Sequence, residues 1–139
     1  MSHQPVVNAL KKLLADYYAL YLKTQNYHWN VEGPRFRELH LLFEEHYTEL
    51  SEAIDTLAEL IRGLGEKAPG TFEAYMHNTS IKPGNESASA EKMLKDLLED
   101  QRQIEKTLNT VLNATQEAED EVVIGFIVDR LTPQNSLDA

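Results

Sequence analysis

The sequence has 139 residues, a formal net charge of −10 and no cysteine. A chain of this length supports one compact domain with one core, and not comfortably two. Without cysteine, disulfides and thiolate metal sites are excluded, so any metal ion must be held by His, Asp or Glu side chains. The negative charge attracts cations and repels nucleic acid phosphates.

The N-terminal segment MSHQPVVNALKK shows no basic stretch followed by an apolar core, so we expect no signal peptide. No stretch of the chain approaches the roughly 18 consecutive apolar residues of a membrane helix. We therefore expect a cytoplasmic protein that makes no contact with a membrane.

Apolar residues recur at helical spacing in four long segments, which we predict to be helices. Their approximate bounds are residues 5–31, 36–64, 89–112 and 120–131. Gly33 and Pro34 break the chain after the first helix, and Pro133 stops the fourth. The last helix is therefore expected to be short.

A long connection, residues 66–87, separates the second helix from the third. Within it we expect a short extra helix over residues 71–78, because Thr71 is a good N-cap. Two helices, a long crossover and two more helices form the order of an all-α, ferritin-like four-helix bundle. We find no repeats and no flexible linker, and we expect a single domain over residues 1–139.

Ionisable side chains line one face of the first two helices. On the first helix, His28 continues a stripe that faces inward or into an interface. On the second helix, steps of three or four residues connect one polar line: His40, Glu44, Tyr47, Ser51, Asp55 and Glu59. His28 and His40 each lie about one turn from the break between the helices, so an antiparallel hairpin places their imidazoles level with each other.

The carboxylates farther along the second helix cannot join these histidines in the same chain. Asp55 is fifteen residues beyond His40, roughly 22 Å along a helix that rises about 1.5 Å per residue. Either the two pairs are half-sites without a purpose, or a second copy of the chain completes them. A two-fold axis would place Asp55 and Glu59 opposite His28 and His40 twice in each dimer. Imidazole and carboxylate ligands suit Fe(II), Mn(II) or Zn(II) rather than copper(I).

The segment YLKTQNYHWNVEGPRFRELHLLFEEHYTELSEAIDTLAELIRGLG resembles the signature of the Dps family. The signature consists of a His, a second His a dozen residues later, and Asp-x-x-x-Glu on the same helix. By this resemblance His28, His40, Asp55 and Glu59 are the ferroxidase ligands, and Glu44 matches the family's additional carboxylate. The resemblance thus implies a two-iron site that is shared between subunits and contains no haem.

The same resemblance implies an assembly and an activity. The family forms a hollow homo-dodecamer built from two-fold dimers, oxidises Fe(II) preferentially with hydrogen peroxide, and stores ferric mineral inside. Such a protein protects the cell from oxidative damage. The family normally continues its last helix for further turns, whereas this chain stops that helix at Pro133.

Two absences distinguish this chain from other ferritin-like proteins. Ferritin and bacterioferritin sites need Glu-x-x-His on a helix, so that one bundle holds both irons. Here the residue three positions before His46 is Phe43, and the residue three positions before His40 is Arg37. The second helix also has no methionine that could bind haem.

Several other residues have two interpretations each. Trp29 either quenches radicals beside the site or fills a dimer interface. The acidic run over residues 117–121 either lines a three-fold pore that draws in iron or, as we favour, places charge at the start of the last helix. We interpret His3, His46 and His77 as hydrogen-bonded bystanders.

Two other functions compete with iron oxidation and storage. Some relatives in the family coat DNA through tails rich in Lys and Arg, which would make this chain a nucleoid protein with secondary iron chemistry. No Lys or Arg precedes Lys11 and none follows Arg130, so we do not expect DNA as a partner. A helical assembly module without chemistry is the third hypothesis, and the His, Asp and Glu spacing disfavours it.

Overall fold

The computed structural model describes residues 4–132, and within that range the chain forms five helices and no strand. They are α1 (Gln4–Asn30), α2 (Phe36–Gly63), α3 (Phe72–Asn78), α4 (Ala90–Ala118) and α5 (Glu121–Leu131). The all-α prediction, with a short helix inside the crossover, is confirmed. α5 ends at Leu131, where the sequence predicts its end, although Pro133 itself lies outside the described residues. None of the helices in the described range is both long and apolar enough to cross a membrane.

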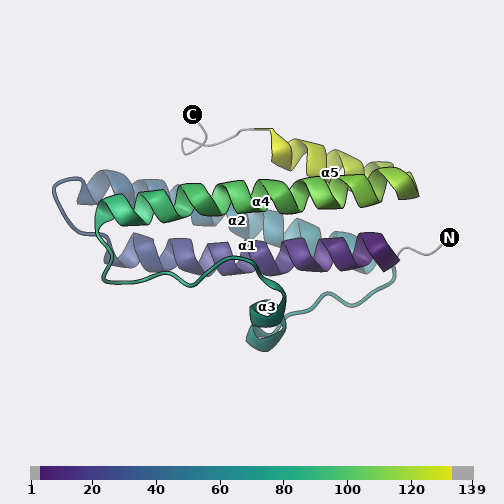
Figure 1. Cartoon of the computed structure of the whole chain (residues 1–139), viewed down its shortest axis with the longest axis horizontal. Helices are drawn as coiled ribbons and strands as arrows, with labels where there is room; N and C mark the ends of the chain where they lie inside the picture. The colour runs from purple at the N-terminus through teal and green to yellow at the C-terminus, as the bar shows by residue number, and fades with distance from the viewer. Residues whose placement is uncertain (1–3, 133–139) are drawn as a thin grey trace.

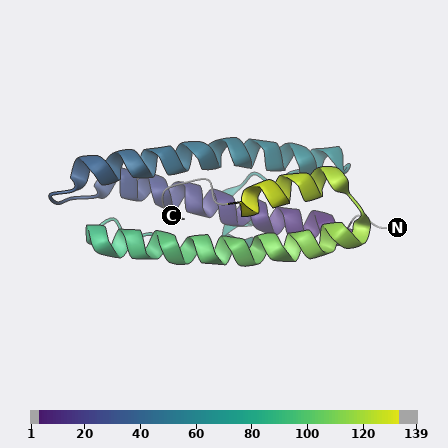
Figure 2. The same cartoon turned by 90° about the horizontal axis from the view of Figure 1, so that it is seen from above.

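The long helices lie along one axis, as Figure 1 shows. α1 and α2 form an antiparallel hairpin, and α4 runs in the same direction as α2, which is why the chain needs a crossover between them. α1 is the central helix, because it packs against α2, α4 and α3. Figure 2 shows α5 between α2 and α4 at one end of the bundle. With 11 residues against the 29 of α4, α5 covers less than half of the bundle's length.

The buried face of α1 forms the centre of the core. Its fully buried apolar side chains follow helical spacing and meet equivalent rows on α2 and α4. The α1 members of this core are Val6, Leu10, Leu13, Leu14, Tyr17, Leu20 and Tyr27.

Three helices begin at side chains that accept a hydrogen bond from the backbone N–H three residues later. These N-caps are Thr71 for α3, Ser89 for α4 and Asp120 for α5. Each satisfies one of the N–H groups that a helix leaves unpaired at its start. For these three helices, capping explains why the expected start agrees with the observed one to within one residue.

The acidic run over residues 117–121 divides between two helix ends. Asp120 caps α5 and Glu121 lies in its first turn, where negative charge is favourable. Glu117 and Glu119 lie at the end of α4, where negative charge is unfavourable. The charge interpretation therefore applies to only part of the run, and the pore lining stays a prediction about assembly.

Glu119 adopts a left-handed backbone, with φ of 56°, at the C-cap of α4. This conformation suits glycine and costs other residues energy. We expect Glu119→Gly to raise the free energy of unfolding by about 0.5–1 kcal/mol, measured by urea denaturation. Glu119→Gln removes the charge but keeps the strained backbone, so it is the matched control. Equal gains from both substitutions would show that charge, not backbone conformation, is the cause.

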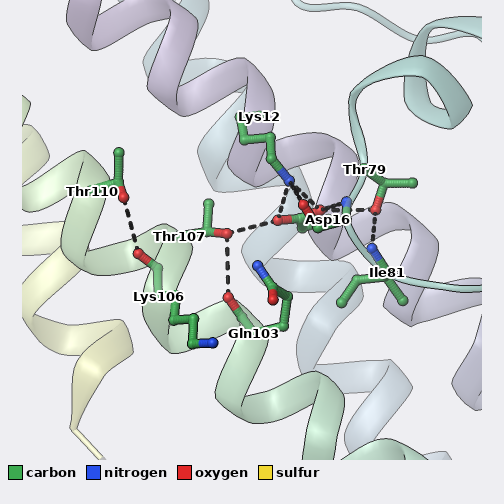
Figure 3. Close-up of polar contacts among 9 residues, drawn as sticks. Lys12, Asp16, Thr79, Ile81, Gln103, Lys106, Thr107 and Thr110 are labelled. Carbon is green, nitrogen blue, oxygen red and sulfur yellow. Dashed lines mark hydrogen bonds and ion pairs between the residues drawn. The ribbon is translucent and has the colours of Figure 1, made fainter.

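Asp16 holds the crossover against the bundle. Its carboxylate is fully buried, and Figure 3 shows side chains from three parts of the chain converging on it. Lys12 Nζ approaches both oxygens at 2.9 Å, and Thr107 Oγ1 on α4 donates at 2.8 Å. After α3, Thr79 Oγ1 donates at 2.8 Å and the Ser80 backbone N–H at 2.7 Å. The carboxylate therefore links α1, α4 and the end of α3.

A second contact secures the crossover farther along. The Tyr27 hydroxyl donates to Asp96 on α4 at 2.9 Å and accepts from the Asn85 backbone N–H at 3.3 Å. Gly84 lies so close that an added Cβ would be 3.0 Å from both Lys23 and Tyr27 side-chain atoms. Only a residue without a side chain fits there without movement of its neighbours.

α5 is fixed to the rest of the bundle by Arg130. Its guanidinium forms an ion pair with Glu49 on α2, with one contact at 2.8 Å, and donates to the Tyr17 hydroxyl on α1 at 2.8 Å. Burial lowers the pKa of Arg130, but the hydrogen bonds and charges of Glu49 and Tyr17 outweigh it and raise the pKa. The guanidinium therefore stays charged and ties the short helix to two long ones.

Candidate metal centre

His28 and His40 face each other across the hairpin, as their spacing predicts. His28 lies in the last turn of α1 and His40 near the start of α2, on either side of a turn in which Gly33 has φ of 113°. That positive φ lets the chain reverse within a few residues. The two imidazole rings stack with their centroids 3.8 Å apart and an interplanar angle of 16°.

Each histidine donates to the backbone of the other. The His28 Nδ1–H lies 2.6 Å from the His40 carbonyl oxygen, and the His40 Nδ1–H lies 2.7 Å from the His28 carbonyl oxygen. A carbonyl oxygen can only accept, so Nδ1 carries the proton in each neutral ring. Both Nε2 atoms then keep their lone pairs, which is the tautomer that binds a metal ion.

Two aromatic rings hold the histidine pair from either side. The Phe36 ring stacks on His40 with centroids 5.0 Å apart, and the Tyr47 ring meets His28 edge-on at 5.2 Å. Because the imidazoles are fixed by rings and by backbone, their orientation does not depend on a bound ion.

Glu44 completes a three-ligand group with the two histidines. It lies one turn after His40 on α2, and its Oε1 is 3.8 Å from His28 Nε2. One ligand atom from each of His28, His40 and Glu44 lies within 4.8 Å of the others. The Glu44 side chain is 51% exposed while that of His28 is 8% exposed, so the group opens toward the surface. A metal ion bound here would keep free positions for further ligands.

Asp55 and Glu59 do not join this group in the same chain. Both are exposed on α2, which continues without a break from Phe36 to Gly63, so the roughly 22 Å rise between His40 and Asp55 stands. A hydrogen bond with Asp55, and the negative charge of Asp55, raise the pKa of Glu59. The two carboxyl groups therefore lie side by side at the surface.

The other histidines are separate from this centre. His46 is buried on the core side of α2, and His77 lies on α3 with its Nε2 3.9 Å from Glu73. Neither belongs to a metal-binding group among residues 4–132, and His3 lies outside the described residues. Trp29 follows His28 directly, and its side chain is 61% exposed on a single chain.

The sequence pattern identifies the ligand side chains but not what orients them. Tyr47 stands on the polar line of the second helix, and its position seven residues after His40 is the signal that could have marked its packing. The paired carbonyl acceptors leave no such signal, because they are backbone atoms brought together by the turn.

Comparison with known proteins agrees with this architecture. Residues 7–136 match the family described as Ferritin-like domain. The DNA protection during starvation protein of Brevibacillus brevis is 38% identical over 124 residues, which cover 89% of this chain and 83% of that protein. An uncharacterized low temperature-induced protein of Nostoc sp. is 42% identical over 106 residues, 76% of this chain. The match spans 59% of the length of the Nostoc protein.

A solved structure shows the same fold. The crystal structure of a Dps protein from Vibrio cholerae, described as a member of a broad superfamily of ferritin-like diiron-carboxylate proteins, superposes with a TM-score of 0.89. It is 34% identical, and the match covers 92% of this chain and 80% of that one. Sequence and structure therefore point to one family.

Proposed function

The chain belongs to the Dps family of ferritin-like proteins, and on that premise we propose that it is a ferroxidase that oxidises and stores iron. The observation that carries the proposal is the pair His28 and His40, whose Nε2 atoms are both left free to bind beside Glu44. Nitrogen and carboxylate ligands without sulfur suit Fe(II). Iron is the substrate here, and its oxidised product is stored as ferric mineral.

The site we propose is shared between two copies of the chain. His28, His40 and Glu44 of one copy form one side, and Asp55 and Glu59 of a second copy form the other. Two features support it: the histidine group is open to the surface, and the acidic pair is exposed far along the same unbroken helix. A two-fold axis that joins one such pair of half-sites joins the other as well. In this proposal both metal positions lie at the interface, and the catalytic ligands are His28, His40, Asp55 and Glu59.

Two irons in one site change the products of peroxide reduction. Each Fe(II) gives one electron, and hydrogen peroxide takes both electrons with two protons to form two molecules of water. Because both electrons leave together, no hydroxyl radical is released. This is the chemical basis for our proposal that the protein protects the cell from oxidative damage and prefers peroxide as oxidant.

We further propose a cytoplasmic homo-oligomer, a dodecamer built from two-fold dimers, in which DNA is not a partner. The formal charge of −10 per chain favours the approach of iron cations and opposes contact with phosphates. The exposed Trp29 beside His28 would be covered when two hairpins pair.

The test is oxidation of Fe(II) without oxygen. We expect rapid oxidation on adding hydrogen peroxide, with about two Fe(II) consumed per peroxide, and a slower reaction in air. His28→Ala/His40→Ala removes both Nε2 ligand atoms and should abolish the rapid phase of oxidation. The absorbance of the ferric product measures the rate. His77→Ala, which removes an exposed histidine outside the group, is the matched control and should oxidise iron like the wild type.

Two results would contradict the proposal. Oxidation in air as fast as oxidation by peroxide would indicate an ordinary ferritin reaction. Consumption of about one Fe(II) per peroxide would indicate that electrons leave singly and that the two-iron site does not form.

A further inference from the structure

Four of the six tyrosines form a continuous row of ring contacts that starts at the metal centre. The centroid distances along the row are His28 to Tyr47 5.2 Å, Tyr47 to Tyr21 5.9 Å, Tyr21 to Tyr18 5.6 Å, and Tyr18 to Tyr75 4.8 Å. The first three contacts are edge-on, and the last is a stacked pair with an interplanar angle of 22°. The row passes from α2 to α1 and ends on α3.

Rings at these separations are in direct contact, since aromatic pairs pack with centroids about 4.5–7 Å apart. Electron transfer between groups in contact is fast, because the coupling falls steeply only across gaps. The row therefore offers a path for single electrons between His28 and the Tyr18–Tyr75 pair. The other two tyrosines lie apart: Tyr17 contacts Arg130 and Tyr27 contacts Asp96.

Phenols suit this task because they give up an electron and a proton together. The chain has no cysteine that would react first, and Met93 is buried in the core, whereas Met76, next to Tyr75, is exposed to solvent. Tyr18 and Tyr75 are only half-buried, so water can take the proton that oxidation releases. The Tyr75 hydroxyl also donates to the Pro69 carbonyl at 2.6 Å, which holds the ring in place.

We propose that Tyr47, Tyr21, Tyr18 and Tyr75 form an electron-donating relay that reduces one-electron oxidants produced at the metal centre. The relay ends on the stacked Tyr18–Tyr75 pair, where the unpaired electron is shared between two rings. The inference rests on the proposed iron oxidation, because that reaction supplies the oxidant. It adds a second protective function for the occasions when a site holds only one iron.

A single Fe(II) gives one electron to hydrogen peroxide, which yields Fe(III), hydroxide and a hydroxyl radical. One tyrosine in contact with the centre gives an electron and a proton to that radical, which becomes water. Electrons then move along the row toward the centre; the first tyrosine takes a proton back from water as it is reduced, and the terminal phenol loses its proton to solvent water. The net reaction turns Fe(II), peroxide, one proton and one tyrosine into Fe(III), two water molecules and one tyrosyl radical.

The experiment uses the full chain with less Fe(II) than sites, so that most occupied sites hold one iron. Hydrogen peroxide is added, samples are frozen within milliseconds, and radicals are detected by electron paramagnetic resonance. Ring-deuterated tyrosine narrows a tyrosyl signal and leaves an indole signal from Trp29 unchanged. A nitrone spin trap measures the hydroxyl radical that escapes, and iron oxidation is followed separately.

We expect a tyrosyl signal in the wild type. In Tyr18→Phe/Tyr75→Phe the radical should stay on Tyr47 or Tyr21, so the wild-type signal of the Tyr18–Tyr75 pair should be replaced by a tyrosyl signal that relaxes faster because Fe(III) is closer. Tyr47 still reduces the first hydroxyl radical but is not regenerated through the row, so trapped hydroxyl radical should rise on repeated additions of peroxide while the rate of iron oxidation stays unchanged. Phenylalanine keeps both rings, so packing is preserved. Tyr27→Phe, the same substitution in a tyrosine outside the row, should leave signal and trapping as in the wild type.

The outcomes separate the relay from the proposed function. If the wild type does not oxidise iron, the proposed function fails and the relay with it. If iron is oxidised but the radical is on indole, or the double variant equals the wild type in both signal and trapping, the relay alone is overturned.

Discussion

Mixing a chain that lacks the two histidines with a chain that lacks the two carboxylates should restore about a quarter of the wild-type rate of iron oxidation. Neither His28→Ala/His40→Ala nor Asp55→Ala/Glu59→Ala should be active alone. Random pairing of equal amounts makes about half of the dimers mixed. In a mixed dimer, one site combines both defects, whereas the other combines intact histidines with intact carboxylates. One working site in two, in half of the dimers, gives the expected quarter.

The control replaces the second chain by one with all four substitutions. It mixes in the same way but brings no intact half-site of either kind, so no activity should return. Mass spectrometry of the intact dimers confirms that mixing has occurred. Mixed dimers without activity would falsify the shared site, because a site within one chain gains nothing from a partner.

Asp16→Ala should lower the free energy of unfolding by about 3–5 kcal/mol, because it removes several hydrogen bonds to a buried carboxylate, each of which contributes about 1.5–3 kcal/mol when the acceptor is charged. The substitution removes the acceptor shared by Lys12, Thr107, Thr79 and the Ser80 backbone, and leaves buried donors without a partner. Urea denaturation at fixed protein concentration measures the loss, since assembly makes apparent stability depend on concentration.

Hydrogen exchange adds a local measurement. The Ser80 amide donates to Asp16 at 2.7 Å, so its hydrogen exchange should be faster in the variant than in the wild type. The exchange rates of amides in the middle of α4 should increase less. Glu105→Ala, which removes an exposed carboxylate on α4, should change stability by no more than about 0.5 kcal/mol. An Asp16→Ala chain as stable as the Glu105→Ala control would show that Asp16 is not what holds the crossover against the bundle.

The helices and the histidine pair could be predicted because their signals are local. Helical periodicity defines the inward face, and N-caps such as Ser89 mark where helices begin. The level placement of His28 and His40 follows because each lies about one turn from the end of its helix at the break between the helices. The same arithmetic along α2 separates Asp55 from His40, and an unbroken helix preserves it.

The rest depends on residues far apart in sequence, for which periodicity carries no information. Asp16 is only an interruption in an apolar stretch until Thr79 and Thr107 are folded onto it, 63 and 91 residues away. The contact between Tyr18 and Tyr75 is also long-range, because Tyr75 is placed beside Tyr18 only by the course of the crossover. Long-range partners of polar and aromatic side chains are set by topology, and topology follows from the whole core.

The reciprocal hydrogen bonds between His28 and His40 fix the two imidazoles within a single chain. Ligand side chains that are already ordered in one chain lose little conformational entropy when a metal ion binds. If a second copy supplies the carboxylates, metal binding and dimerisation are thermodynamically linked. Iron then strengthens the dimer by the same factor by which the dimer strengthens the hold on iron. A chain without a partner would release its ion readily, so that iron is retained only where the assembly that stores it has formed.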